Sequence, residues 1–221
     1  MRLSEIQKPY DLFVSLGSAC DPAAHLRRRG LRKFSMPLDW VASMSLPDVC
    51  RLFEDRFIDY MNINNMQRID GTANYYDEEA VEPSIEPASQ TTQFIRDSKY
   101  NVISVHDFVV VKDVSWQEQY PAYREKLVLR IERLLSSLEQ AETVLFVRWS
   151  GALDTAIELH KVLSLLTMGR VDLLLLQPVQ GVRIVTPCES GTSGVCVVQT
   201  PNLPADASMW DNVLEGMTLR A

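Results

Sequence analysis

Several short runs of apolar residues are spaced along the chain, and they are rich in Val, Ile, Leu and Phe. The runs lie at residues 12–16, 101–105, 143–147, 171–176 and 195–199. Their apolar residues are nearly continuous instead of alternating with polar ones, which is typical of strands in a parallel sheet that is covered on both faces. A further strand is predicted near residues 73–76.

Segments with the 3.6-residue periodicity of amphipathic helices separate these runs. Asp21 and Pro22 form a good cap and first-turn pair, so one helix is predicted to begin at Asp21. The other predicted helices span residues 46–57, 117–140, 154–167 and 209–217. This alternation predicts an α/β fold: a single three-layer α/β/α domain over residues 1–221, with a mostly parallel sheet.

Residues 62–99 are the least regular part of the chain, and we expect an irregular insertion there. Within it, residues 77–87 are acidic and are interrupted by proline. Such a composition cannot bury much apolar surface, so we predict a solvated loop that acts as a mobile flap over the site.

Composition narrows the class of protein. Hydrophobic residues make up 46% of the 221 residues, which excludes wholesale disorder, and the net charge of −7 argues against a nucleic-acid partner. The apolar runs are too short for a membrane span, and the N-terminus lacks the apolar segment of an export signal. We therefore expect a cytoplasmic protein with reduced cysteines. No Walker loop, GxGxxG, HExxH or CxxC motif occurs, so no cofactor and no metal site is predicted.

Polar residues follow the predicted strands where each strand ends. They are Gly17, Ser18, Cys20, His106, Asp107, Arg148, Trp149, Ser150, Gln177 and residues 200–202. In open α/β sheets the ligand binds beyond the carboxyl ends of the strands, so the sheet is predicted to gather these residues at one rim. We expect Gly17, Ser18, Arg148 and Trp149 to contact the substrate there.

Cys20 is the candidate nucleophile. It is predicted at the N-terminus of a helix, where main-chain N–H groups and the helix dipole favour a thiolate. A nucleophilic thiol needs a base, and His106 alone among the three histidines lies at a predicted strand end. The alternative for Cys20 is a small buried side chain without chemistry, and the neighbouring Asp21 disfavours the thiolate.

Two carboxylates are candidates to orient His106. Asp107 follows it directly, and contact between the two requires the strand to have ended. Asp39 lies in a turn, and its carboxylate is expected either to reach the site or only to stabilise the turn. Arg148 ends a very apolar strand, so we expect it to pair with a carboxylate or with an anionic substrate group.

The other basic residues have simpler interpretations. One basic cluster is predicted to be a solvated helix end, with binding of phosphate or of an acidic polymer as the alternative; it consists of Arg27, Arg28, Arg29, Arg32 and Lys33. On the predicted helix 117–140, the charged residues are predicted to form an outer face: Arg124, Lys126, Arg130, Glu132 and Arg133.

Several separated motifs resemble one known family. SLGSAC, LRRRGLRKFS and PLDW lie within residues 10–40, and VHDF, RIERLL and LFVR follow in the same order. Together they resemble the domain family of unknown function catalogued as putative papain-like cysteine peptidases. The resemblance implies a Cys–His enzyme with Cys20 as nucleophile and His106 as base. PLDW stands where the family has Pro-Phe-Asp-Trp, which leaves Asp39 in place, and a papain-like α+β layout is the alternative fold.

These observations predict a cysteine-nucleophile enzyme, a peptidase, amidase or acyltransferase. It would act on an amide, ester or thioester of a small-molecule, peptide or glycan substrate. The alternative from another class is a non-catalytic α/β protein that binds a carbohydrate or a nucleotide sugar. A scaffold protein without any site is the third possibility.

Overall fold

A computed structural model describes residues 1–75 and 90–220. Five helices lie in the described part of the chain: α1 (Asp21–Arg28), α2 (Leu46–Glu54), α3 (Trp116–Gln140), α4 (Leu153–Leu166) and α5 (Ala207–Val213). Short 3-10 turns occur at Leu3–Glu5 and Ile63–Asn65. The predicted helices are therefore confirmed, with ends that differ by a few residues.

The larger sheet has five strands in the order β2-β7-β8-β10-β9. They are β2 (Leu12–Ser15), β7 (Thr143–Trp149), β8 (Arg170–Pro178), β10 (Val195–Thr200) and β9 (Thr186–Cys188). The first four are mutually parallel, and only β9 pairs antiparallel, with β10. The mostly parallel sheet predicted from the apolar runs is confirmed.

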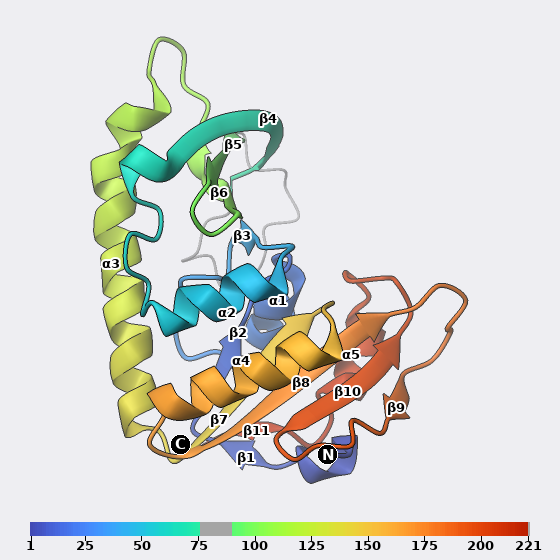
Figure 1. The fold of residues 1–221 in the computed structure, drawn as a ribbon. Coiled ribbons are helices and arrows are strands. Elements are labelled where there is room, and N and C mark those ends of the chain that lie inside the picture. The colour runs from blue at the N-terminus through green and yellow to red at the C-terminus, as the bar shows by residue number, and fades with distance from the viewer. Residues whose placement is uncertain (76–89, 221) are drawn as a thin grey trace.

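Both faces of this sheet are buried, because alternate strand residues enter two separate apolar clusters. Val14, Phe146 and Leu175 pack with residues of α2 and α4 on one face. Phe13 and Leu145 pack with residues of α1 and α5 on the other face. Figure 1 shows α2 and α4 in front of the sheet and α1 and α5 behind it. The result is the expected three-layer arrangement.

A second sheet is formed by the segment between α1 and β7. It is antiparallel with the order β3-β6-β5-β4. Its strands are β3 (Val41–Ala42), β6 (Val102–Val109), β5 (Thr91–Asp97) and β4 (Met66–Asn74). The expectation that the strand at residues 101–105 joins the parallel sheet was therefore wrong. Figure 1 shows this sheet beside the upper part of α3, away from the parallel sheet.

Two bulges bend the antiparallel sheet at the same place. Ile95 pairs with Ser104 and Gln93 pairs with Phe108, so residues 105–107 of β6 lie opposite Phe94 alone. Residues 69–71 of β4 also lie opposite Phe94, and β4 is strongly curved in Figure 1. A bulge redirects side chains and interrupts their alternation between the two faces. The bulge in β6 contains His106 and Asp107.

A short parallel pair, β1 (Pro9–Tyr10) with β11 (Thr218–Leu219), joins the two ends of the chain. The predicted irregular insertion at residues 62–99 contains β4 and β5, which are regular strands. The flap predicted at residues 77–87 lies outside the described residues. The division of the chain into one domain stays a prediction.

Candidate active site

The loop after β2 is held in an unusual conformation. Gly17 and Ser18 both have positive φ angles, of 73° and 80°. A Cβ atom on Gly17 would lie 2.6 Å from Ser43 Oγ, so the close approach of these two segments requires glycine. Ser18 N–H donates to Ser43 Oγ at 2.9 Å, and Ser43 N–H donates back to Ser18 O at 3.2 Å. The loop that leads to Cys20 is thus fixed to the segment around Ser43.

The side chain of Arg148 holds the same loop in place through hydrogen bonds. Its side chain is 0% exposed, and its guanidinium donates to Leu16 O at 2.7 Å and to Ser150 O at 3.1 Å. It also donates to the hydroxyl and the carbonyl oxygen of Ser43. No carboxylate in the described parts of the chain pairs with it, so the expected ion pair is not found. Main-chain carbonyls and the Ser43 hydroxyl solvate this cation instead, and burial lowers its pKa.

Trp149 also lies in the core. It is buried, and its ring centroid is 6.0 Å from that of Trp210 on α5. These contacts favour a structural role for Arg148 and Trp149, and substrate contact by either residue stays an untested prediction. Ser18 was expected to contact the substrate, but its N–H is not available for this because it donates to Ser43 Oγ.

Cys20 is the N-cap residue of α1 and is half-buried. The N–H groups of Ala19 and Cys20 have no acceptor within residues 1–75 and 90–220. They are therefore available to a ligand, as donors at a helix N-terminus commonly are. Sγ of Cys20 likewise has no hydrogen-bond partner in the described residues.

The charge environment of Cys20 opposes ionisation. Burial first, and then the negative charges of Asp21, Asp107 and Asp39, raise the pKa of Cys20 to about 12. Cys20 is therefore a thiol at neutral pH. The same interactions show that Asp39 and Asp107, from two other segments, lie within electrostatic reach of Cys20.

His106 does not end a strand, as the sequence had suggested, because β6 continues to Val109. The bulge at residues 105–107 brings His106 and Asp107 to the same cavity despite their adjacent positions. Nδ1 of His106 lies 2.8 Å from Asn74 O, an acceptor that requires the proton on Nδ1 and leaves the lone pair on Nε2. Burial lowers the pKa of His106, while the Asn74 carbonyl and the charge of Asp107 oppose this shift.

The carboxylates have partners other than the imidazole. Asp107 Oδ2 accepts from Ser104 Oγ, and Oδ1 lies 3.9 Å from an amino nitrogen of Arg130. Asp107 therefore acts on His106 through its charge. Asn74 carries no signal in the sequence that would mark it as a site residue, yet its carbonyl oxygen accepts the hydrogen bond that orients the ring.

Asp39 is completely buried at 0% exposure. Its Oδ2 accepts from Arg32 at 2.7 Å and from Met36 N–H at 2.9 Å, whereas Oδ1 has no partner in the described residues. Burial raises the pKa of Asp39 to about 6, although Arg32 and the Met36 N–H partly oppose the shift. Arg32 also lies over the ring of Trp40, and Trp40 meets His106 edge-on with centroids 6.3 Å apart.

This geometry changes the interpretation of the basic cluster. Arg32 is inside the protein and not at a solvated helix end. Arg28 and Arg29 pair with Asp211 on α5, at 2.6 Å and 3.4 Å. These three residues are therefore used to hold α1 and the turn at residues 36–40 in place.

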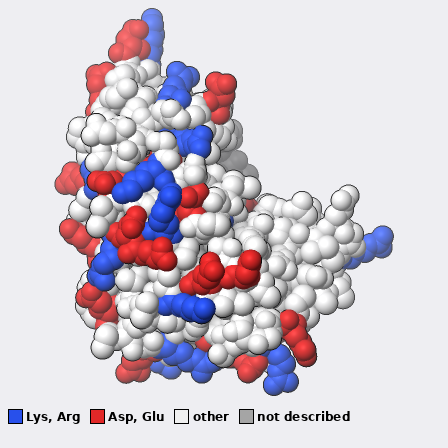
Figure 2. Space-filling model, viewed as in Figure 1, with Lys and Arg blue, Asp and Glu red and all other residues white. Residues whose placement is uncertain are grey.

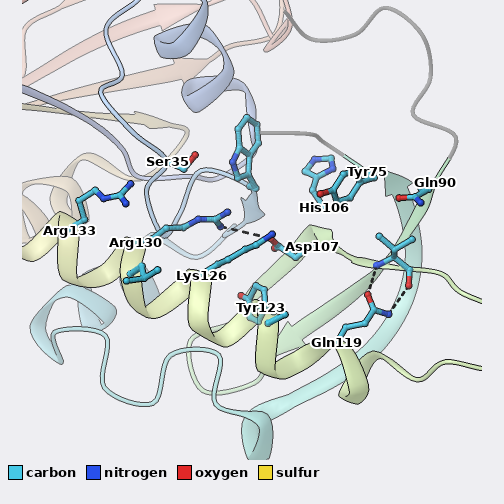
Figure 3. Close-up of a pocket in the computed structure, with 14 residues that line it drawn as sticks. Ser35, Tyr75, Gln90, His106, Asp107, Gln119, Tyr123, Lys126, Arg130 and Arg133 are labelled. Carbon is cyan, nitrogen blue, oxygen red and sulfur yellow. Dashed lines mark hydrogen bonds and ion pairs between the residues drawn. The ribbon is translucent and has the colours of Figure 1, made fainter. Parts of the chain in front are cut away.

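A cavity of about 740 Å³ lies between α3 and the antiparallel sheet. Figure 3 shows His106, Asp107 and Tyr75 on the sheet side, with Lys126, Arg130 and Arg133 on successive turns of the helix. Its lining consists of Ser35, Trp40, Tyr75, Gln90, His106, Asp107, Val109, Gln119, Ala122, Tyr123, Lys126, Leu129, Arg130 and Arg133.

The prediction that this part of α3 is only an outer charged face was wrong. Arg130 is 9% exposed, and it lines the cavity together with Lys126 and Arg133. The spacing of these three residues places them on one side of a helix, a signal already present in the sequence. Gln119 joins α3 to the end of β6 by two hydrogen bonds with the main chain of Val109, at 3.0 Å and 2.8 Å.

A family model described as "Putative papain-like cysteine peptidase (DUF1796)" matches residues 11–172. The chain belongs to this family. The matched region runs from the start of the parallel sheet into β8 and contains Cys20, Asp39, His106, Asp107 and Arg130. Both sides of the candidate site therefore lie within the family domain.

The chain is also similar to the uncharacterized protein R408 of Acanthamoeba polyphaga mimivirus, with 24% identity over 142 residues. The alignment covers 62% of this chain and spans about 60% of the length of that relative. No solved structure matches the fold significantly.

Within residues 1–75 and 90–220, no group of three or more His, Cys, Asp or Glu side chains is arranged to hold a metal ion. In the same residues, no helix has both the length and the apolar character that a bilayer span requires.

Proposed function

We propose that the protein is a cysteine-nucleophile enzyme that cleaves or transfers the acyl group of an amide, ester or thioester. The observation that supports the proposal is electrostatic: the charge of Asp107 acts on both the Cys20 thiol and the His106 imidazole, which come from separate segments of the chain. The free N–H groups of Ala19 and Cys20 add donors for an oxyanion.

The protonation states of Cys20 and His106 favour general-base catalysis, in which a neutral imidazole takes the proton of a neutral thiol. Cys20 is a thiol and His106 is a neutral imidazole at pH 7, because burial raises the pKa of the first and lowers that of the second. In the proposed reaction, Nε2 of His106 takes the Sγ proton as sulfur attacks the carbonyl carbon. Cys20 Sγ has no hydrogen-bond partner in the described residues, so the contact is proposed to form when substrate binds.

The tetrahedral oxyanion would face the Ala19 and Cys20 N–H groups. Its collapse breaks the bond to the leaving group, which takes the proton from His106 and leaves a thioester on Cys20. Water, or an amine or hydroxyl acceptor, then gives its proton to His106 and attacks the thioester carbonyl. Collapse of this second intermediate breaks the C–S bond, releases the acyl product and returns the proton from His106 to Cys20 Sγ. Asp107 stabilises the transient imidazolium through its charge, and Asp39 is proposed to support the site by fixing Arg32 beside Trp40.

An acyl-trapping experiment tests the proposal without knowledge of the substrate. The protein is incubated with p-nitrophenyl acetate, and the adduct is located by intact-mass and peptide mass spectrometry. We expect acetylation of Cys20, its loss in Cys20→Ser, and its retention in Cys188→Ser, which changes another half-buried thiol. Acetylation that persists in Cys20→Ser at the wild-type rate would contradict the assignment.

The role of His106 has its own readout. His106→Ala should slow acylation by roughly 10²- to 10⁴-fold without removing the thiol. In the wild type, the acid limb of the pH–rate profile should lie below pH 6.5, the ordinary pKa of histidine, because burial lowers the pKa of His106. An unchanged rate in His106→Ala would remove this residue from the mechanism.

Other parts of the expected function remain proposals. In the alternative function, a non-catalytic sugar-binding protein, Arg148 would bind an anionic group of the ligand. The guanidinium of Arg148 instead donates its hydrogen bonds to main-chain carbonyls. A nucleic-acid partner finds no support on the face in Figure 2, where basic and acidic side chains are interspersed. A cytoplasmic location stays a prediction.

A further inference from the structure

One face of α3 presents a row of cations to the cavity beside His106. Lys126, Arg130 and Arg133 line it from the helix, and Figure 3 shows all three on the side that faces the sheet. Such a row is unexpected in a chain with a net charge of −7. The described lining residues therefore carry a net positive charge, opposite in sign to that of the whole protein.

Among the described residues that line the cavity, cations outnumber carboxylates. Asp107 is the one carboxylate among the lining residues of the described chain, and it lies 3.9 Å from Arg130. Lys126 and Arg133 have no carboxylate within 4.0 Å in the described residues. The guanidinium of Arg133 instead lies 5.0 Å from the ring centre of Phe34.

The three cations that line the cavity differ in their exposure to solvent. Arg130 is nearly buried, with its guanidinium 3.9 Å from Asp107, whereas Lys126 and Arg133 are exposed. Trp40 and Tyr123 add aromatic surface beside these charges. A partly desolvated guanidinium binds a carboxylate or phosphate more strongly than a solvated one does, and the aromatic surface accommodates an apolar body.

We propose that this cavity is a subsite for an oxyanion, a carboxylate or a phosphate, carried by the substrate near its reactive acyl group. The assignment rests on the proposed function, since it identifies the cavity beside His106 as the place where the rest of the substrate lies. Lys126 and Arg133 attract and hold the anion, and Arg130 fixes its inner end. The substrates would then be acidic acyl compounds, including peptides with an acidic side chain.

Direct binding tests the subsite independently of catalysis. Inorganic phosphate, glutarate and the neutral glutaramide are titrated into the protein by calorimetry. We expect saturable binding of an anion and none of glutaramide; the anion that binds more tightly identifies the preferred oxyanion. The double variant Lys126→Gln/Arg133→Gln should weaken anion binding by about tenfold, since exposed ionic contacts contribute modestly.

The matched control is Lys112→Gln/Lys161→Gln. It removes two exposed positive charges that do not line the cavity, so the net charge changes equally. This control should bind the anion within about twofold of the wild type. Equal weakening in both double variants, or no saturable anion binding at all, would overturn the subsite.

A pair of esters then separates the subsite from the proposed reaction. p-Nitrophenyl hemiglutarate and p-nitrophenyl valerate carry acyl groups of equal length, with and without a carboxylate. We expect a higher kcat/KM for the acidic ester, a preference that the Lys126→Gln/Arg133→Gln variant loses. Anion binding without Cys20-dependent turnover of either ester would refute the reaction and keep the anion site. Cys20-dependent turnover of both esters at equal rates would refute the subsite and keep the reaction.

Discussion

The buried carboxyl group of Asp39 makes a quantitative test of the site possible. Asp39→Asn replaces it with an amide of nearly the same shape, which still accepts from Met36 N–H through its oxygen. Asp39 is completely buried, and only one of its oxygens has hydrogen-bond partners in the described residues. Its ionised form therefore lacks much of the solvation that it would have in water.

The size of the effect follows from the pKa. Burial raises the pKa of Asp39 from 3.8 to about 6, so within this interval the folded protein holds a proton that the unfolded chain has released. The stability from this group is complete below the unfolded pKa and is lost as the pH rises through the folded pKa. At roughly 1.4 kcal/mol per pKa unit, the loss is about 3 kcal/mol.

The assay is urea denaturation of the wild type and Asp39→Asn at matched ionic strength, at several pH values between about 4 and about 7. The free energy of unfolding of the variant minus that of the wild type should increase by roughly 2.5 kcal/mol between these pH values, because asparagine does not titrate. Other titrating groups cancel in this difference. A difference that is independent of pH would refute the reasoning.

A control of opposite sign is available at Asp206. It accepts from the hydroxyl of Ser208 and from main-chain N–H groups at the start of α5, and these bonds lower its pKa. The corresponding difference for Asp206→Asn should therefore decrease as the pH rises through the acidic range. Turnover measured on the folded Asp39→Asn variant then isolates any support that Asp39 gives to the reaction from its effect on stability.

Three further predictions concern the loop that carries Cys20. Gly17→Ala should destabilise the protein by roughly 2 kcal/mol more than Gly30→Ala in urea denaturation, because both glycines have φ near +70° but only the first meets a neighbour within 4 Å; equal costs would contradict this. Iodoacetamide at pH 8 should label Cys20 about 10³-fold more slowly than an ordinary thiol, given a pKa of about 12 against 9.0, and Asp21→Asn should accelerate it; rapid labelling of the wild type would refute the neutral-thiol state. Arg148→Met should lower the free energy of unfolding by roughly 3 kcal/mol or more in urea denaturation, because three main-chain carbonyl oxygens lose their hydrogen-bond donors. A free energy of unfolding within about 1 kcal/mol of the wild-type value would argue against a structural role for Arg148.

The parallel sheet could be predicted because its strands carry their own signature. β7 and β8 are apolar on both faces, and no exposed face interrupts the run. The antiparallel sheet lacks that signature: most residues of β4 are exposed or half-buried, and β4 pairs only with β5. β6 was recognised as a strand but assigned to the wrong sheet, because an apolar run does not specify its partner.

Some residues of the candidate site could likewise be predicted from local sequence signals, and others could not. Cys20 follows from local signals, since Gly17 and the Asp21-Pro22 pair mark a turn into a helix. The orientation of His106 does not, because it depends on a bulge opposite Phe94 and on the Asn74 carbonyl, which are set by strand pairing. The rule that a buried arginine meets a carboxylate failed for Arg148, because the ends of β2 and β7 leave carbonyl oxygens that satisfy it.

The segment at residues 36–42 joins the two parts of the site and sets their spacing. Leu38 lies against the backbone of Gly17 on the side of the parallel sheet, and Trp40 meets His106 on the side of the antiparallel sheet. Val41 in β3 then pairs with Ser104 of β6, just before the bulge. Because Asp39 lies between these contacts and holds Arg32 against Trp40, we expect a change at this segment to shift Cys20 and His106 relative to each other. The spacing of the proposed nucleophile and base would then depend on the turn between the two sheets and not on either sheet alone.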